Sequence, residues 1–219
     1  MWRNLIVLAM LLFFGCNSNT PKKEKTENSN VLGEARIFTK LTSQTTGIQF
    51  ENRLVENDTL NYFTYPYLYM GGGVSVGDIN NDGLNDLFFT GNMVSNKLYL
   101  NKGNLEFTDI TLNSGLEGDK RWYTGTTMAD INGDGLLDIY CAVAGQSGNK
   151  QNQLFINMGD NTFEEQAVTY GLNDAGNSVD ATFFDFDKDG DLDVYVANYP
   201  ITPFEYNSYH YKMRMDRVT

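Results

Sequence analysis

A nine-residue pattern that occurs three times is the feature that most restricts how this chain can fold. The pattern is D-x-[DN]-x-D-G-x-x-D, and its copies begin at Asp78, Asp130 and Asp185. Consecutive copies begin 52 and then 55 residues apart. Similar spacing of a repeated motif indicates a tandem array of one structural unit.

The chemistry of the pattern favours a calcium ion. Oxygen side chains at positions 1, 3 and 5 converge when the chain turns back, and glycine at position 6 permits the sharp turn. A backbone carbonyl at position 7 and Asp at position 9 complete an all-oxygen shell. Calcium takes about six to eight oxygen ligands, whereas magnesium prefers a tighter octahedron. The sequence therefore predicts three Ca²⁺ sites.

Two other interpretations of the loops are weaker. An EF-hand loop starts in the same way but needs Glu at position 12, where this chain has Phe89, Cys141 and Val196. Acidic surface turns without an ion would explain one copy, but not three in the same register. The loops also lie between runs of β-branched and aromatic residues, which predict strands and not the helices of an EF-hand.

The repeat extends beyond the loop into a four-stranded unit. Lys97–Gly103 and Gln153–Gly159 are alternating runs that end in Asn-x-Gly turns, and 105–111 and 162–168 follow as fourth strands. Four antiparallel strands in about 50 residues are typical of a β-propeller blade. The predicted fold class is therefore all-β, with a β-propeller of four-stranded antiparallel blades and calcium-binding hairpin loops.

The unit G-D-I-N-x-D-G-x-x-D-L, followed by N-K-L-Y-L-N-x-G and F-x-D-I-T, resembles the FG-GAP or VCBS-type repeat. It is similar to bacterial cartilage-acidic-protein-like lipoproteins and, more distantly, to the N-terminal propeller of the integrin α chain. The resemblance covers about residues 35 to 200. It implies a seven-bladed propeller with calcium-loaded loops on one rim.

The resemblance also implies a ligand set for each loop. Leu84, Leu136 and Asp191 would contribute only their backbone carbonyls. The side-chain ligands would be Asp78, Asn80, Asp82 and Asp86, then Asp130, Asn132, Asp134 and Asp138, then Asp185, Asp187, Asp189 and Asp193.

The N-terminus predicts export. Residues 1–16 hold one basic residue, an apolar run from Leu5 to Phe14 and then Gly15-Cys16, which resembles a bacterial lipoprotein signal peptide lipidated at Cys16. An ordinary signal peptide with an incidental cysteine is the alternative. Residues 17–34 are polar and predict a flexible tether. We expect an exported protein of the bacterial cell envelope, lipid-anchored in the outer membrane or at the cell surface.

Residues 35–219 form the predicted propeller domain, with repeats at about 70–116, 122–172 and 177–219. This length suffices for about three to three and a half blades, and about four are needed to close a ring. We therefore expect an incomplete three-blade arc with an exposed, aggregation-prone edge. Phe38–Ile48 resembles the outer strand at 107–116 and predicts a strand that completes a last blade.

Other candidate sites are weaker. Gly71-Gly72-Gly73 lacks the Lys-Ser/Thr of a phosphate loop and favours close packing of an inner strand. The aromatic run from Tyr62 to Tyr69 could stack on sugars, but packing between blades is favoured. His210 is the only histidine and is expected at the surface, and no residue set predicts a nucleophilic triad. We predict no catalytic residues.

The net charge of −12 makes nucleic acid and anionic lipid poor partners. The leading hypothesis is a non-enzymatic, calcium-stabilised, extracytoplasmic propeller module that binds a protein or glycan, with membrane contact only through a lipid anchor. The alternative is the propeller part of a larger secreted enzyme that acts on polysaccharide, with catalytic residues outside this chain. A truncated product without an independent role is a third possibility.

Overall fold

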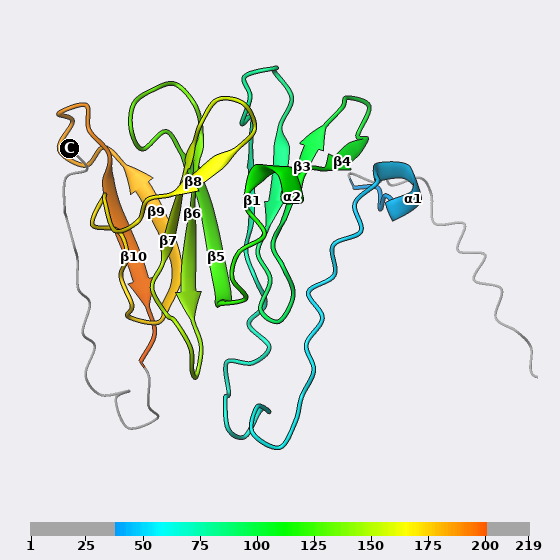
Figure 1. Cartoon of the computed structure of the whole chain (residues 1–219), viewed down its shortest axis with the longest axis vertical. Coiled ribbons are helices and arrows are strands. Elements are labelled where there is room, and N and C mark those ends of the chain that lie inside the picture. The colour runs from blue at the N-terminus through cyan, green and yellow to red at the C-terminus, as the bar shows by residue number, and fades with distance from the viewer. Residues whose placement is uncertain (1–37, 201–219) are drawn as a thin grey trace, which may run out of the picture. The chain divides into compact units, whose positions relative to one another are not determined.

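The computed structural model describes residues 38–200, which form three antiparallel sheets side by side (Figure 1). The first sheet, blade 1, contains β1 (Val74–Gly77), β2 (Asp86–Phe89), β3 (Lys97–Asn101) and β4 (Phe107–Asp109). Blade 2 contains β5 (Trp122–Ala129), β6 (Asp138–Ala144), β7 (Gln153–Asn157) and β8 (Phe163–Glu165). Blade 3 contains, within the described residues, β9 (Ser178–Phe184) and β10 (Asp193–Asn198).

The connectivity is that of propeller blades. In blades 1 and 2 the strands pair in sequence order and always antiparallel, so each blade is a meander of hairpins. The inner strands β1, β5 and β9 lie next to one another (Figure 1). The predicted all-β class with four-stranded antiparallel blades is confirmed, and each nine-residue loop joins the first two strands of its blade. The predicted fourth strands are shorter than expected, at three residues each.

The hydrophobic core lies between the blades. One buried cluster joins residues of blade 1, among them Phe88 and Leu98, to residues of blade 2 that include Tyr123 and Ile139. A second cluster joins Tyr140 and other residues of blade 2 to Ala181 and Val194 of blade 3. Because side chains alternate along a strand, the two faces of blade 2 take part in different clusters.

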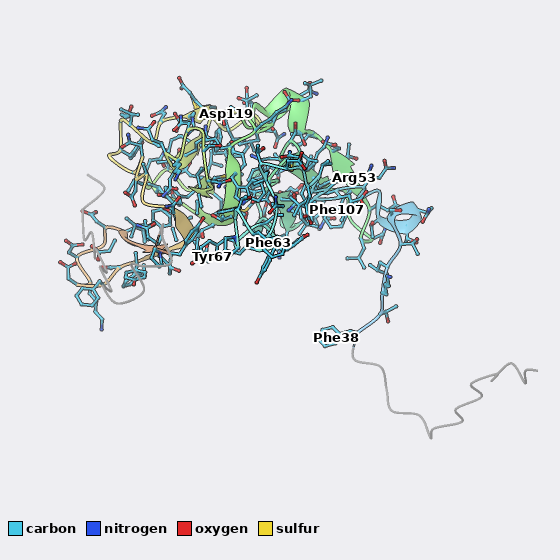
Figure 2. All side chains as sticks on the ribbon, turned by 90° about the horizontal axis from the view of Figure 1, so that it is seen from below. Phe38, Arg53, Phe63, Tyr67, Phe107 and Asp119 are labelled. Atoms are coloured by element: carbon cyan, nitrogen blue, oxygen red, sulfur yellow. The ribbon has the colours of Figure 1, made fainter. Side chains whose placement is uncertain are left out.

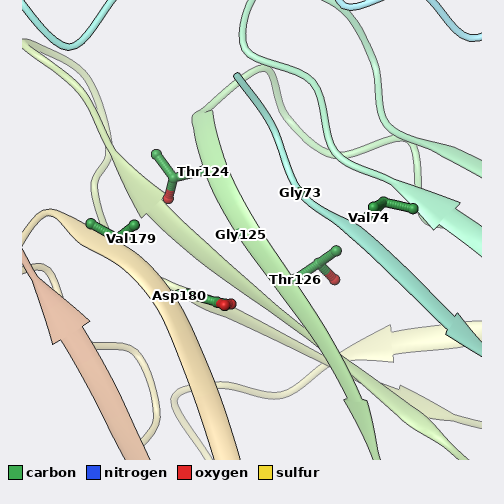
Figure 3. Close-up of a pocket in the computed structure, with 7 residues that line it drawn as sticks. All are labelled: Gly73, Val74, Thr124, Gly125, Thr126, Val179 and Asp180. Carbon is green, nitrogen blue, oxygen red and sulfur yellow. The ribbon is translucent and has the colours of Figure 1, made fainter. Parts of the chain in front are cut away.

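Glycines allow the inner strands to approach closely. A Cβ on Gly73 would lie 2.6 Å from the Thr126 nitrogen, and one on Gly125 would lie 2.4 Å from the Val179 carbonyl oxygen. Both contacts are with the backbone of the next blade, which confirms the packing role predicted for Gly73. A pocket of about 200 Å³ lies between the inner strands. Figure 3 shows the residues that line it, of which Asp180 is the charged one.

The strand predicted at Phe38–Ile48 does not form. Residues 43–46 make a one-turn helix, α1 (Ser43–Thr46), whose N-cap is Thr42 and whose left-handed C-cap is Gly47. A strand needs a partner for its backbone groups, and the described residues provide none at this position. The local turn instead matches α2 (Thr111–Ser114), which also ends at a left-handed glycine, Gly115.

Residues 48–72 connect α1 to β1 and contact blade 1 through Asn52 and blade 2 through Tyr65. Tyr65 packs edge-on against Trp122 of blade 2 with ring centroids 5.5 Å apart, and its hydroxyl lies 2.6 Å from the hydroxyl of Tyr199. Tyr65 and Leu68 are buried, which confirms packing between blades for part of the aromatic run. Phe63, however, is 93% exposed (Figure 2).

The regions assigned from sequence to a signal peptide and a tether, together with residues 201–219 and His210, lie outside the described residues. Within residues 38–200, neither helix is long enough to cross a bilayer, since each has four residues and about 20 are needed.

A buried asparagine fastens blade 2 to blade 3. The Asn152 side-chain oxygen accepts a hydrogen bond from the Val143 N–H at 2.7 Å. Its amide nitrogen donates to the Tyr140 hydroxyl and to the Ser178 hydroxyl, each at 2.8 Å. Asn96 occupies the matching place in blade 1, where its oxygen accepts from the Gly91 N–H at 3.0 Å.

We predict that Asn152→Ala destabilises the fold by about 1 to 3 kcal/mol, because a buried N–H loses its acceptor. Asn149→Ala is the matched control, since its side chain bonds only an exposed turn and its loss should cost less than about 0.5 kcal/mol. Urea unfolding of the two variants measures both values. Equal unfolding midpoints would contradict the role assigned to Asn152.

Candidate metal centre

The three nine-residue loops, called loop 1 (residues 78–86), loop 2 (130–138) and loop 3 (185–193) after their blades, lie at the same end of the blades (Figure 1). Each closes a tight hairpin in which position 9 is the first residue of the second strand and pairs with the last residue of the first strand. Gly77 pairs with Asp86, Ala129 with Asp138 and Phe184 with Asp193. The fold therefore brings all the acidic residues predicted as ligands to one rim.

The same hydrogen bonds organise all three loops. The glycine N–H at position 6 donates to the position 1 carboxylate, at 2.7 Å for Asp78, 2.9 Å for Asp130 and 3.2 Å for Asp185. The N–H at position 7 donates to the position 5 carboxylate in each loop. These pairs are Leu84 to Asp82 at 2.9 Å, Leu136 to Asp134 at 2.8 Å and Asp191 to Asp189 at 3.1 Å.

Position 3 differs between the loops. Asn80 and Asn132 each donate their amide to the position 5 carboxylate, at 3.1 and 2.9 Å, and accept the N–H of the same residue. Loop 3 has Asp187 there instead. One carboxylate oxygen each of Asp185, Asp187 and Asp193 lie within 4.8 Å of one another.

The carboxylates at position 9 of loops 1 and 2 are fully buried, whereas Asp193 of loop 3 is only half-buried. Asp86 accepts hydrogen bonds from the backbone N–H of Ile79 at 3.0 Å and of Asn101 at 2.8 Å. Asp138 accepts from Ile131 at 2.9 Å and from Asn157 at 2.9 Å. Each therefore ties its loop to the third strand of the blade.

The surroundings of the position 9 carboxyls in loops 1 and 2 disfavour their ionised form. Burial raises the pKa of the Asp86 and Asp138 carboxyls, the backbone N–H groups lower it, and nearby loop acids, Asp82 and Asp134 respectively, raise it further. Crowded carboxylates favour a bound cation, because it stabilises the ionised form of every group around it.

Two structural features of the rim escaped the sequence analysis. Position 4 adopts the left-handed conformation in every loop, at Asn81, Gly133 and Lys188, with φ of 56°, 74° and 62°. Asparagine and glycine tolerate this conformation and could have indicated it, but lysine could not. The second feature is contact between neighbouring units: the Asn81 amide donates to the Gly135 carbonyl at 3.0 Å, and the Asn157 amide to the Ile79 carbonyl at 2.8 Å.

The donor set fits calcium. The side chains assigned to the loops offer only carboxylate and amide oxygens, without a sulfur or imidazole ligand, and such hard donors suit calcium and magnesium rather than zinc. Within the described residues, loop 3 alone brings three carboxylates within 4.8 Å of one another, whereas the three aspartates of loop 1 and of loop 2 are more widely spaced. The residues present therefore match a hard cation.

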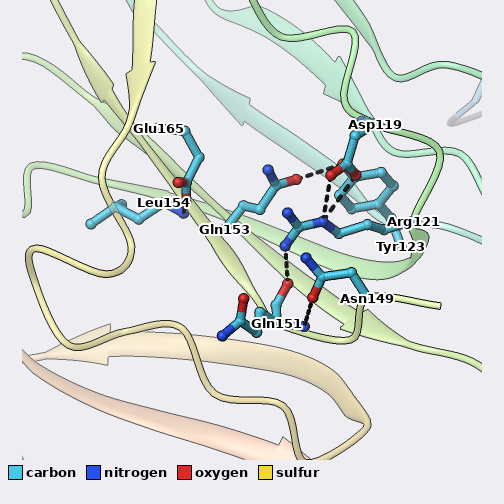
Figure 4. A network of polar contacts seen from close by, with 8 residues as sticks. All are labelled: Asp119, Arg121, Tyr123, Asn149, Gln151, Gln153, Leu154 and Glu165. Carbon is cyan, nitrogen blue, oxygen red and sulfur yellow. Dashed lines mark hydrogen bonds and ion pairs between the residues drawn. The ribbon is translucent and has the colours of Figure 1, made fainter.

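A second polar cluster lies at the other end of blade 2 and links the start of β5 to the start of β7 (Figure 4). Arg121 contacts both Asp119 oxygens, at 2.9 and 2.8 Å, and donates to the Gln151 carbonyl at 2.6 Å. The Tyr123 hydroxyl donates to Gln153 at 2.5 Å, and burial raises the pKa of Tyr123. These contacts pair the charged and polar groups of the cluster with one another.

Cys141 is a free, fully buried thiol. Burial raises its pKa to about 12, so the thiolate is scarce at neutral pH and the sulfur is unreactive.

The fold and the repeated rim define a module of tandem propeller blades. The family model for the FG-GAP-like repeat matches residues 78–141 and 130–196, more than half of the chain, and the chain belongs to this family.

Among curated proteins, the chain is similar to cartilage acidic protein 1. It is 33% identical to the protein from Xenopus tropicalis over 135 residues, and 32% and 30% identical to those from Mus musculus and Homo sapiens over 132 and 135 residues. The matched regions cover 58 to 59% of this chain. They span only 20% of each relative, so the chain corresponds to about a fifth of their length.

We predict that Asp138→Ala destabilises the metal-free protein by about 1 to 3 kcal/mol, because two buried N–H groups lose their acceptor. Asp134→Ala in the same loop is the control: the groups that its carboxylate accepts from, the Asn132 amide and the Leu136 N–H, are exposed and turn to water, so the loss should stay below about 1 kcal/mol. Both are measured by urea unfolding in chelator. A similar cost for the two variants would show that position 9 has no structural role of its own.

Proposed function

We propose that this FG-GAP repeat module is a calcium-stabilised binding module outside the cytoplasm, attached to the cell envelope through a lipid on Cys16. The observation that supports it most is the recurrence of one hydrogen-bonded acidic loop at the same end of three successive blades. Turns that served only to reverse the chain would not need acids at positions 1, 5 and 9 each time.

The proposed ions would stabilise the fold by neutralising the rim. Ten of the twelve side chains assigned as ligands are carboxylates, and they crowd into three adjacent loops. An ion that binds only the folded state adds stability in proportion to the logarithm of its concentration. Calcium outside a cell could thus hold the rim rigid.

The proposed binding role follows from this rigidity. A scaffold with fixed strands can present loops and exposed aromatic side chains to a protein or glycan without paying for their ordering at the moment of binding. Phe63, which is held in an ordered turn by neighbouring hydrogen bonds, is one such exposed group.

A glycan array probed in calcium and in EGTA tests whether the module binds glycans. We expect Phe63→Ala to remove binding of the glycan or protein while the fold stays intact.

We predict that calcium raises the melting temperature of chelated protein, by about 5 to 10 °C for each occupied site at a hundredfold excess over its dissociation constant. Magnesium at the same concentration should give a smaller shift. Differential scanning calorimetry measures both. A melting temperature that does not respond to calcium would refute the proposed metal role.

Loop 3 offers a matched pair of variants. Asp185→Ala removes the position 1 ligand and should lower the calcium stoichiometry from three to two. Asp187→Asn recreates the side-chain set of loops 1 and 2, so it should keep all three ions with weaker affinity at this site. Isothermal titration calorimetry distinguishes the two results. Equal losses in both variants would contradict the assigned ligand positions.

Lipid attachment is tested separately. In a bacterial host, the chain should incorporate an alkynyl fatty acid and partition with membranes, and Cys16→Ser should abolish both. Labelling that persists in the variant would contradict anchoring at Cys16.

A further inference from the structure

Loops 1 and 2 contact each other through hydrogen bonds that lead to their acidic side chains. The first contact starts at position 4 of loop 1, where the Asn81 amide donates to the Gly135 carbonyl of loop 2 at 3.0 Å. This carbonyl belongs to the peptide unit whose N–H, on Leu136, donates to the Asp134 carboxylate at 2.8 Å. A single peptide group thus connects loop 1 to the position 5 carboxylate of loop 2.

The second contact joins the two buried carboxylates at position 9. Ile79 of loop 1 donates its backbone N–H to Asp86 at 3.0 Å. The Ile79 carbonyl accepts from the Asn157 side-chain amide at 2.8 Å. The backbone N–H of Asn157 in turn donates to Asp138 of loop 2 at 2.9 Å. Three hydrogen bonds through two residues therefore link Asp86 to Asp138.

A third contact between these loops is apolar. Gly77 is the last residue before loop 1, and a Cβ on it would lie 2.5 Å from the Leu137 Cδ1 atom at position 8 of loop 2. Because the glycine has no side chain, Leu137 comes close to the backbone at the start of loop 1. Loops 1 and 2 are therefore in contact at three places.

The carboxylates of loops 1 and 2 have to approach one another to share an ion. Two oxygens bound to one calcium at about 2.4 Å lie no more than about 4.8 Å apart. Among the described residues, three carboxylates meet this limit in loop 3, whereas the aspartates of loops 1 and 2 are more widely spaced. Bringing them together moves the backbone groups to which they are hydrogen-bonded, and some of these groups also contact the other loop.

We propose that loops 1 and 2 bind calcium cooperatively, with Asn81 and Asn157 as the positioning residues that couple the two sites. This inference rests on the calcium role proposed above. Closing one loop orders backbone groups that contact the other, so the second ion meets a loop that loses less conformational entropy on binding. The coupling is reciprocal, and typical couplings change affinity by about 5-fold to 150-fold.

Position 4 provides a variant that separates this coupling from the turn itself. Asn81, Gly133 and Lys188 all have left-handed backbones there, so the turn does not depend on the side chain. Gly133 has no side chain, and loop 2 therefore lacks the side-chain amide with which Asn81 reaches the next loop. Asn81→Gly copies loop 2 and removes the amide without straining the backbone.

Calcium titrations by isothermal titration calorimetry measure the coupling. All proteins carry Asp185→Ala, which disables loop 3. The protein with two working loops is compared with Asp78→Ala, which leaves loop 2, and with Asp130→Ala, which leaves loop 1. The coupling factor is the product of the two single-site dissociation constants divided by the product of the two stepwise constants of the two-loop protein. We expect a factor of at least about five.

The charge that Asp78→Ala or Asp130→Ala removes also weakens the neighbouring site, so the factor alone does not identify its cause. Asn81→Gly, introduced into all three proteins, leaves every charge in place. It should keep two ions bound to the two-loop protein and lower the coupling factor at least about twofold. Lys188→Gly makes the same kind of change at position 4 of loop 3 and should leave the factor unchanged.

Asn157→Ala tests the buried connection, and Asn101→Ala is its matched control. Asn101 takes the same place in blade 1: its amide donates to the position 8 carbonyl, Asn85, at 2.8 Å, as that of Asn157 donates to Leu137 at 3.1 Å. Asn157 also donates to the neighbouring loop, a contact that the described residues do not offer to Asn101. Both substitutions should cost stability, but only Asn157→Ala should lower the coupling factor. Melting curves in chelator check that each variant is folded.

The results distinguish failure of this inference from failure of the metal role. If the two-loop protein binds no calcium, both are refuted. If two ions bind with a coupling factor of one, or with a factor that neither Asn81→Gly nor Asn157→Ala lowers, the metal role stands and the coupling is overturned. An equal decrease in the two control variants would also overturn it, because the coupling would then not pass through Asn81 and Asn157.

Discussion

Burial between blades is the interaction on which the rest of this structure depends. Neither core cluster belongs to one sheet: the first lies between blades 1 and 2, and the second between blades 2 and 3. A single four-stranded sheet has two apolar faces and cannot cover either alone, so each blade is stable only with neighbours. The close glycine contacts of β1 and β5 follow from the same requirement, because any side chain there would separate the inner strands.

The sequence predicted the parts of the fold that depend on local pattern. The aspartates at fixed spacing located three hairpins, and the alternating runs after them located the third strands. It did not predict the turn at Ser43–Thr46, because the similarity to residues 107–116 lay in the glycine-capped turn and not in the strand. Nor could it show that Asn81 and Asn157 contact the neighbouring unit, since the partners are backbone carbonyls 54 and 78 residues away.

Position 9 of the loops joins the rim to the blade. Asp86 and Asp138 were predicted only as metal ligands, yet each also accepts two backbone hydrogen bonds, one from its own loop and one from the third strand. Their burial could not be read from an acidic residue in a polar loop, since aspartate is seldom buried without a partner. A cation held at this position would act on a carboxylate that is already part of the sheet.

The position of blade 2 has a consequence for local opening. All seven residues of β6 are buried, and blade 2 is the one described blade with neighbours on both sides. In arrays stabilised by nearest neighbours, fluctuations start at the ends, where one interface is missing. The amides of β6 should therefore be the last to exchange with solvent, and the gradient of protection should run outward from the middle sheet.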